Sequence, residues 1–320
     1  MNGGFVTEFL FGDTRVATDS ERATVRMHLD ERTEGWVGIP HGGIGMGSIM
    51  ELASFLEAGP RDTNTRYPMS AEFRMGGASV RTGDTVTVSV VSSDGGFTGS
   101  IVPDGEDRPY IEGTVRYGAD ERNRRDDFIS FLPASYSEIH ESLARLPHYR
   151  NCFVCGVERT SPGLNRVFNY LNDSRINKTV VSHVGMDDAD DATVHRFSTG
   201  SMLHPIAPLA LLDEVMGWGG FLVSGQGGVS VRLGYTFYRG IRIGERVVMF
   251  GRGTRVKGSV SSRMLFWADG GAAVIGSDGT LEPVIVSSGQ WFAVSELTEQ
   301  MKIQLMPQDL IDRAFALAGS

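Results

Sequence analysis

The sequence predicts an α+β protein made of two tandem units, each a curved antiparallel sheet wrapped around a central helix. The first observation is length, because 320 residues exceed what one hydrophobic core usually serves. The second is an internal repeat: residues 41–52 (HGGIGMGSIMEL) align without gaps on residues 204–215 (HPIAPLALLDEV). The third is the pattern after each repeat, where an apolar helical run is followed by alternating runs typical of antiparallel strands.

The first unit opens its repeat with a Gly-rich turn that leads into a helix over 44–58. This helix is apolar almost all round, as expected of a helix that is covered on most sides. An alternating strand pattern follows and meets a turn at Gly83-Asp84, and two long strands are expected over roughly 98–117. The stretch before this turn is three residues longer than its counterpart in the second half, which predicts a small insertion.

The second unit repeats this order with a helix over 206–222, which is also apolar almost all round. Its strands meet a turn at Gly244-Glu245, and two long strands are expected over roughly 258–294. The end of the chain has a helical pattern that is broken near Pro307, since proline cannot continue a helix.

The domain boundaries follow from these patterns and from a change in composition. We expect the first unit over 1–120 and the second over 149–297, with a C-terminal helical tail over 298–320. Between the units, residues 121–148 are first highly charged and then weakly helical, which is typical of a linker.

Composition and charge exclude several classes of protein. The chain carries 30 Lys and Arg against 39 Asp and Glu, a formal net charge of -9, which argues against a general nucleic-acid binder. The N-terminal stretch lacks the basic and apolar regions of a signal peptide, and no run reaches the roughly 18 apolar residues of a membrane span. With only two cysteines as well, we expect a cytoplasmic protein without nucleic-acid or membrane partners.

Three motifs resemble the hotdog-fold acyl-CoA thioesterases. NCFVCGVERTSPGL at 151–164 is similar to the segment that opens a unit of that family, GIPHGG at 38–43 resembles the turn before its central helix, and LLDEVMGWGG at 211–220 resembles the helix itself. The resemblance implies two hotdog units in one chain that acts on an acyl-CoA thioester. It also implies an active site between paired units, with the His-Gly-Gly turn from one unit and an acid from the helix of the other.

The two halves depart from the family pattern in complementary ways. The first half keeps the turn but has Met50 in place of the acid, whereas the second half keeps the acid but has Pro205, which lacks an N–H, in its turn. The resemblance therefore implies one composite site, made of His41, Gly42, Gly43 and Asp213. The mirror site would combine His204, Pro205 and Ile206 with Met50, and we expect it to be inactive.

These residue types suit thioester hydrolysis. The reaction needs stabilisation of the negative charge on the carbonyl oxygen and a group that activates or replaces water. A Gly-Gly turn at a helix start offers exposed N–H groups and the positive end of the helix dipole. Asp213 would act either as a general base or as a direct nucleophile. We expect His41 to orient the turn or the carbonyl, and Glu51 and Glu214 to have structural or interface roles.

A basic segment in the second half bears on substrate binding. Between residues 232 and 263 there are eight Arg and Lys against one acid, a charge of +7. Because Arg recognises phosphate well, we expect the nucleotide end of coenzyme A near these strands. The alternative is an exposed basic face of the sheet. The residues proposed to bind substrate are Arg239, Arg242, Arg246, Arg255 and Lys257.

Two other functions remain open at this stage, a hydratase or dehydratase that acts on acyl thioesters and a non-catalytic acyl-CoA binding protein. No cofactor is expected beyond the coenzyme A of the substrate. No metal is expected either, because zinc would need more ligands than Cys152, Cys155 and the nearby His148 offer, and the cysteines are expected to pack. A homodimer of the two-unit chain agrees with the resemblance, because paired hotdog units often associate further.

Overall fold

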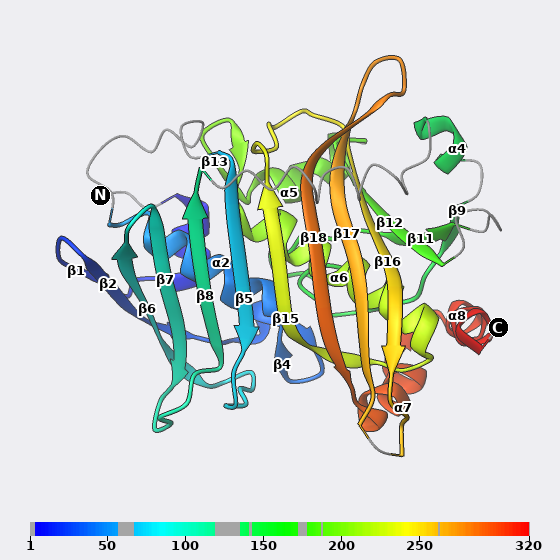
Figure 1. Cartoon of the computed structure of the whole chain (residues 1–320), viewed down its shortest axis with the longest axis horizontal. Coiled ribbons are helices and arrows are strands. Elements are labelled where there is room, and N and C mark those ends of the chain that lie inside the picture. Colours follow the sequence, from blue (N-terminus) through cyan, green and yellow to red (C-terminus); the bar gives the residue numbers. More distant parts are fainter. Residues whose placement is uncertain are drawn as a thin grey trace.

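Thirteen strands form one antiparallel sheet that curves around two helices (Figure 1). The predicted class, α+β with a curved antiparallel sheet wrapped around a central helix in each unit, is confirmed. The computed structural model describes residues 4–56, 67–118, 135–140, 143–171, 178–186, 188–261 and 263–319.

The two units supply opposite sides of this sheet. From the outer edge inward, the first unit contributes β1 (Ala17–Thr18), β2 (Arg22–His28), β6 (Thr85–Ser93), β7 (Gly96–Pro103), β8 (Ile111–Tyr117) and β5 (Met69–Met75). From the centre outward, the second unit contributes β15 (Gly228–Phe237), β18 (Leu281–Ala293), β17 (Leu265–Ile275), β16 (Val247–Lys257), β12 (Thr179–Val184), β11 (Phe168–Leu171) and β9 (Leu143–Arg145).

β5 and β15 join the two units at the centre of the sheet. They pair antiparallel, with Met69 opposite Phe237 and Arg74 opposite Arg232. On either side of this junction the strand order corresponds, β5-β8-β7-β6-β2 in the first unit and β15-β18-β17-β16-β12 in the second. The repeat found in the sequence thus extends to an approximate twofold relation between the two units.

Two central helices, α2 (Gly42–Ala53) and α6 (Ile206–Ser224), lie against the inner face of the sheet and contact each other. Alternation in β6 sends Val86, Val88 and Val90 inward, where they are fully buried next to α2. α6 is long and apolar enough to span a membrane, but 78% of its most apolar stretch is buried inside the protein. Its composition is therefore that of a core helix.

The end of the predicted linker belongs to the second unit. Within 121–148, α4 (Tyr136–His140) is followed by β9 and by β10 (His148–Tyr149), and β9 forms the outer edge of the sheet. A three-residue strand carries too little pattern to be separated from a charged connection. The rest of the predicted linker lies largely outside the described residues.

The C-terminal segment also belongs to the second unit. α7 (Ser295–Gln304) follows β18 directly and packs beside β15, β19 (Leu305–Met306) pairs with β10, and α8 (Gln308–Gly319) packs on α6. The helical pattern is interrupted near Pro307, as predicted. The remaining elements are α1 (Phe5–Phe11), η1 (Glu31–Thr33), β3 (Glu34–Trp36), β4 (Ile39–Pro40), α5 (Asp188–His195), β13 (Ser198–Thr199) and β14 (Met202–Leu203).

Candidate active site

His41 caps the start of α2. Its Nδ1 atom accepts a hydrogen bond from the Gly43 N–H at 2.9 Å, and its carbonyl oxygen accepts one from the Ile44 N–H at 2.9 Å. Two amide groups that a helix start would otherwise leave unpaired are thus satisfied. Within the described residues, the Gly42 N–H has no hydrogen-bond acceptor, and it stands at the positive end of the helix dipole.

The two glycines of the turn have different surroundings. A Cβ atom on Gly43 would lie 2.3 Å from the Cβ of Ala210, so this glycine lets α2 approach α6 closely. Gly43 N–H is already occupied by His41. The expectation that both glycines offer free amide groups to a substrate is therefore corrected, since Gly43 serves helix packing and Gly42 alone presents an unpaired N–H.

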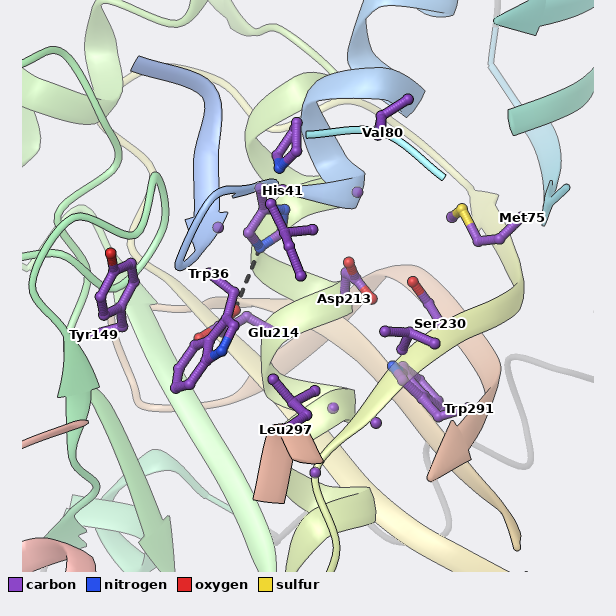
Figure 2. A pocket seen from close by; sticks show the side chains of 18 of the residues that line it. Trp36, His41, Met75, Val80, Tyr149, Asp213, Glu214, Ser230, Trp291 and Leu297 are labelled. Atoms are coloured by element: carbon purple, nitrogen blue, oxygen red, sulfur yellow. Dashed lines mark hydrogen bonds and ion pairs between the residues drawn. The ribbon is translucent and has the colours of Figure 1, made fainter. Parts of the chain in front are cut away.

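The close approach of α2 and α6 brings Asp213 to Gly42. A Cβ atom on Gly42 would lie 3.1 Å from the Oδ2 atom of Asp213 and 3.6 Å from the Oγ atom of Ser230. Figure 2 shows the side chains of Asp213 and Ser230 turned toward one another beside the start of α2. The structure thus brings together the His-Gly turn of the first unit and the acid of the second.

Ser230 is a candidate site residue that sequence reasoning missed. It lies on β15 at an irregularity of the pairing with β18, where the register shifts between Ser230 and Arg232. Such shifts redirect side chains, but nothing in the alternating pattern of the segment distinguishes this serine from others on strands.

Glu214 contacts His41 from the opposite unit. The Oε2 atom of Glu214 lies 3.3 Å from the Nε2 atom of His41, and both side chains line the cavity. Because Gly43 donates to Nδ1, a neutral His41 carries its proton on Nε2 and donates it to Glu214. Both ring nitrogens are therefore engaged within the protein, and the expected interface role of Glu214 has a definite partner.

Burial sets the acidity of Asp213. The residue is only 9% exposed, and desolvation raises its pKa, while the charge of His41 lowers it and that of Glu214 raises it; together they shift it from 3.8 to about 6. A carboxyl group with this pKa is ionised at neutral pH and remains a useful proton acceptor.

Opposing effects act on the protonation of His41. Burial lowers the pKa of the ring, whereas the hydrogen bond to Glu214 and the charges of Cys152, Asp213 and Glu214 raise it. A proton on Nδ1 would have to displace the Gly43 N–H, which donates to this atom at 2.9 Å, so the helix cap opposes the charged form and the ring in this arrangement is neutral.

These residues open onto a cavity of about 460 Å³ (Figure 2). Its walls come from both units: the turn before α2, the loop after β5, one side of α6 and the start of β15. The C-terminal segment forms part of its wall, because Leu297, Met301 and Leu305 line it, and Gln300 accepts a hydrogen bond from the Trp36 Nε1–H at 3.0 Å. Its large apolar side chains are those of Trp36, Met75, Tyr110, Tyr149, Trp218, Phe221, Trp291, Leu297, Met301 and Leu305.

The predicted insertion in the first unit forms one wall of this cavity. Residues 75–81 line it, and the loop is held by hydrogen bonds from Gly76 N–H to the Tyr110 carbonyl oxygen and from Ala78 N–H to the Pro109 carbonyl oxygen. Arg81, which is exposed, is the only Arg or Lys among the described lining residues.

The mirror site keeps the helix cap and loses the reactive groups. His204 Nδ1 accepts from the Ile206 N–H at 3.1 Å, and its Nε2 atom lies 3.2 Å from Glu51 Oε2. Met50 takes the place of the acid, and Pro205 takes the place of Gly42. This arrangement offers neither a carboxylate at the acid position nor an N–H at the proline.

The five basic residues predicted to bind the nucleotide do not lie together. Arg239 is paired with Glu245 at 2.9 Å and Glu282 at 3.4 Å, and with Arg242 and Arg246 it follows the end of β15 farthest from the cavity. Arg255 and Lys257 are on β16, three strands from β15, or about 14 Å away. None of the five lines the cavity, because β-strand direction separates residues that are neighbours in sequence.

Cys152 lies beside the His41–Glu214 pair. Its Sγ atom accepts from the N–H groups of Val154 and Cys155, and it lies within 4.8 Å of donor atoms of His41 and Glu214. A hydrogen bond to Cys152 and burial raise the pKa of the Cys155 thiol well above its usual range. His41, Cys152 and Glu214 are residue types that bind metal ions, and their atoms are close enough to share one.

Two observations favour a hydrogen bond over metal ligation at this cluster. A metal-bound His usually donates its other ring N–H, but Nδ1 of His41 is an acceptor, so ligation at Nε2 would require the ring to lose its last proton. The His204–Glu51 pair also has nearly the same geometry, and within the described residues no cysteine groups with it. The His–Glu contact is thus explained without a shared ion.

Comparison with known proteins gave matches in structure only. No family model and no curated protein matches the sequence. A putative thioesterase II from Thermobifida fusca YX is 14% identical with a TM-score of 0.52, the match covering 91% of this chain and 99% of that one. A tesB protein from Mycobacterium avium subs. paratuberculosis is 12% identical with a TM-score of 0.50, covering 91% and 98%. The dehydratase domain of PpsC from Mycobacterium tuberculosis, solved with C12:1-CoA, is 13% identical with a TM-score of 0.49, covering 89% and 98%.

The first two matches establish the fold of this chain. It is a double hotdog, with both units in one polypeptide, since each match spans nearly the whole of both chains. At 12–14% identity the likeness extends to the fold alone. The reaction has to be inferred from the site.

Proposed function

We propose that the chain hydrolyses an acyl-CoA thioester at the composite site of His41, Gly42 and Asp213. The observation that carries this proposal is the position of the Asp213 carboxylate, whose Oδ2 would stand 3.1 Å from a Cβ on Gly42 at the start of α2. A proton acceptor and an unpaired backbone N–H then border the same space in an apolar cavity. The structure from Thermobifida fusca YX, which is named as a putative thioesterase II, shares this fold, which agrees with the proposal.

Gly42 would stabilise the oxyanion. The thioester carbonyl oxygen accepts a hydrogen bond from the Gly42 N–H, and the dipole of α2 stabilises the negative charge that develops on this oxygen. The absence of a side chain lets the carbonyl approach the backbone. Loss of one such donor typically lowers the rate by about 100- to 1000-fold.

Asp213 would act as a general base. A water molecule between the Asp213 carboxylate and the Ser230 hydroxyl gives a proton to Asp213, and its oxygen adds to the carbonyl carbon. The tetrahedral intermediate then breaks its C–S bond, and Asp213 returns the proton to the coenzyme A sulfur. The products are a carboxylic acid and the free thiol, so one water is consumed per turnover.

The hydrogen bonds of both His41 ring nitrogens favour hydrolysis over dehydration. A dehydratase needs a base that removes a proton from the carbon next to the thioester carbonyl, and His41 is the candidate in this cavity. Its Nδ1 accepts from Gly43 and its Nε2 faces Glu214, so neither nitrogen is directed at a substrate carbon. This leaves His41 in a structural role at the helix start.

The shape of the cavity supports an apolar acyl group. Tryptophan, phenylalanine, methionine and leucine side chains from α6, α7 and β18 provide the surface against which a hydrocarbon chain would pack. Arg81 stands among the lining residues as an exposed cation that could meet a phosphate of coenzyme A.

The test is release of free thiol from acyl-CoA substrates of two to sixteen carbons, with wild type and Asp213→Asn compared. Hydrolysis by wild type and a loss of at least about 100-fold in the variant would support the proposal. Interconversion of enoyl-CoA and 3-hydroxyacyl-CoA without thiol release would instead assign a hydratase. Tight binding of acyl-CoA with neither reaction would assign a binding protein.

A single turnover in ¹⁸O-labelled water separates the two roles of Asp213. A general base delivers oxygen from water to the acid in the first turnover. A nucleophilic Asp213 would form a mixed anhydride, and if water attacks the Asp213 carbonyl, the first molecule of acid released would contain no ¹⁸O and the label would be in Asp213.

A further inference from the structure

The His–Glu contact occurs twice in the molecule, once in each direction between the units. Glu214 on α6 meets His41 at 3.3 Å, and Glu51 on α2 meets His204 at 3.2 Å. In both cases the histidine uses Nδ1 to accept the N–H of the residue two positions later. A contact that recurs with the same atoms in two diverged halves indicates a structural feature of the fold, in which a glutamate of one unit holds the histidine that caps the central helix of the other.

The hydrogen bonds of the His41–Glu214 pair determine which ring nitrogen of His41 carries the proton. Nδ1 of His41 can accept the Gly43 N–H only when it carries no proton. The ring proton of a neutral His41 is then on Nε2, where Glu214 accepts it. Glu214 thereby selects both the tautomer and the orientation of the ring, and through the ring it holds the first turn of α2.

The two His–Glu pairs differ in their surroundings. The side chain of Glu51 is 2% exposed and also accepts a hydrogen bond from Thr7 of α1, so it is enclosed by protein. The side chain of Glu214 is 19% exposed and lines the cavity. In the mirror half the residue after the histidine is Pro205, which has no N–H, so the His204–Glu51 pair has no such group to position.

Glu214 and Asp213 are neighbours on α6 but serve different partners. Successive residues of a helix point about 100° apart, so one carboxylate faces Gly42 while the other faces His41. The pair thus contacts the α2 start from two directions.

We propose that Glu214 is a positioning residue of the site: by accepting the Nε2 proton of His41 it holds the cap of α2 and so aims the Gly42 N–H at the substrate oxygen. This inference rests on the proposed thioesterase function. Glu51 performs the same task for His204 without serving a reaction.

The experiment compares matched substitutions in the two units. Glu214→Leu removes the acceptor, Glu214→Gln keeps a carbonyl oxygen that can accept the Nε2 proton, and Glu51→Leu and Glu51→Gln are the controls in the inactive half. We expect Glu214→Leu to lower kcat by about 10- to 100-fold with KM changed less than about threefold, and Glu214→Gln to retain most of kcat. The Glu51 variants should lose stability and keep kcat per folded molecule.

A second measurement reports on the mechanism without activity. Long-range ¹H–¹⁵N correlation spectra of the histidine rings identify which nitrogen carries the proton. We expect His41 to be the Nε2–H tautomer in wild type and Glu214→Gln, and a mixture in Glu214→Leu.

Three results would overturn the proposal: an Nδ1 proton on His41 in wild type, an unchanged tautomer in Glu214→Leu, or a loss of kcat in Glu51→Leu equal to that in Glu214→Leu. If wild type cleaves no acyl-CoA, the proposed function fails, while the tautomer spectra still decide whether Glu214 sets the His41 ring.

Discussion

Asp213 approaches Gly42 so closely that a methyl group on the glycine would stand 3.1 Å from the carboxylate Oδ2. Gly42→Ala therefore fills the space in which the thioester carbonyl is proposed to sit. We expect kcat/KM to fall by about 10- to 100-fold, with little change in stability, because the nearest atoms are all ends of side chains.

Gly43→Ala is the contrasting variant. Its methyl group would lie 2.3 Å from the Cβ and 2.6 Å from the Cα of Ala210, so α2 and α6 would have to separate. We expect a loss of about 1–3 kcal/mol in the free energy of unfolding, measured by urea denaturation. Equal stability losses in the Gly42 and Gly43 variants would contradict the division of roles between them.

The activity should depend on pH through Asp213. Because its pKa is raised to about 6, the carboxyl group gains a proton below that value and can no longer accept one from water. We expect kcat/KM to be level from about pH 7 to 8 and to fall about tenfold per unit well below pH 6. Ser230→Ala should be slower but show the same break, whereas a flat profile from pH 5 to 7 would argue against Asp213 as the base.

The same carboxylate should lower the stability of the protein at neutral pH. Its pKa in the folded state lies above 3.8, so the native state binds the proton more tightly than the unfolded state does. The resulting stabilisation is complete below pH 3.8 and is lost as the pH rises through about 6. We expect Asp213→Asn to be more stable than wild type by up to about 3 kcal/mol at pH 8, and the difference to shrink toward pH 4. Thermal unfolding at several pH values measures this, and a constant difference would contradict it.

α7 should set the length of the acyl group. Leu297 lines the cavity, whereas Ile303 on the same helix is 77% exposed. Leu297→Trp should therefore shift the preferred acyl-CoA to shorter chains, with kcat/KM for the longest substrates reduced at least about tenfold. Ile303→Trp is the matched control and should leave the profile unchanged. The same profile in both variants would show that the acyl chain lies elsewhere.

Restoring an acid to the mirror site should not restore activity. Met50→Asp supplies a carboxylate, but Pro205 still lacks the N–H that Gly42 provides. We expect no gain in kcat and a stability loss of about 1–3 kcal/mol, because Met50 is only 8% exposed. The background for this assay is Asp213→Asn, in which any new hydrolysis would be visible and would contradict the role given to Pro205.

The sequence carried the information needed for the architecture. A gapless repeat and two apolar helices predict two similar units, and the pairing of β5 with β15 agrees with that symmetry. The complementary positions of Met50 and Pro205 also pointed to Asp213 and His41 as partners from different units. These inferences depend on local pattern and on symmetry, both of which are visible in one dimension.

Other features depend on three-dimensional relations that a linear pattern does not contain. Strand direction places Arg239 and Lys257 at different ends of the sheet, although they are close in sequence. The role of Gly43 follows from its distance to Ala210, which only the crossing of α2 and α6 determines. Ser230 gained its position from a local shift in strand register, for which the residue types give no signal.

The junction of β5 and β15 within one polypeptide also has a genetic consequence. In a dimer of identical subunits, any substitution appears in both copies, so a residue needed in one copy cannot be lost from the other. In this chain the two units are encoded separately, and the codon for residue 50 can change without affecting the codon for residue 213. Selection can then maintain the residues of one composite site, which come from both units, while the residues of the mirror site diverge.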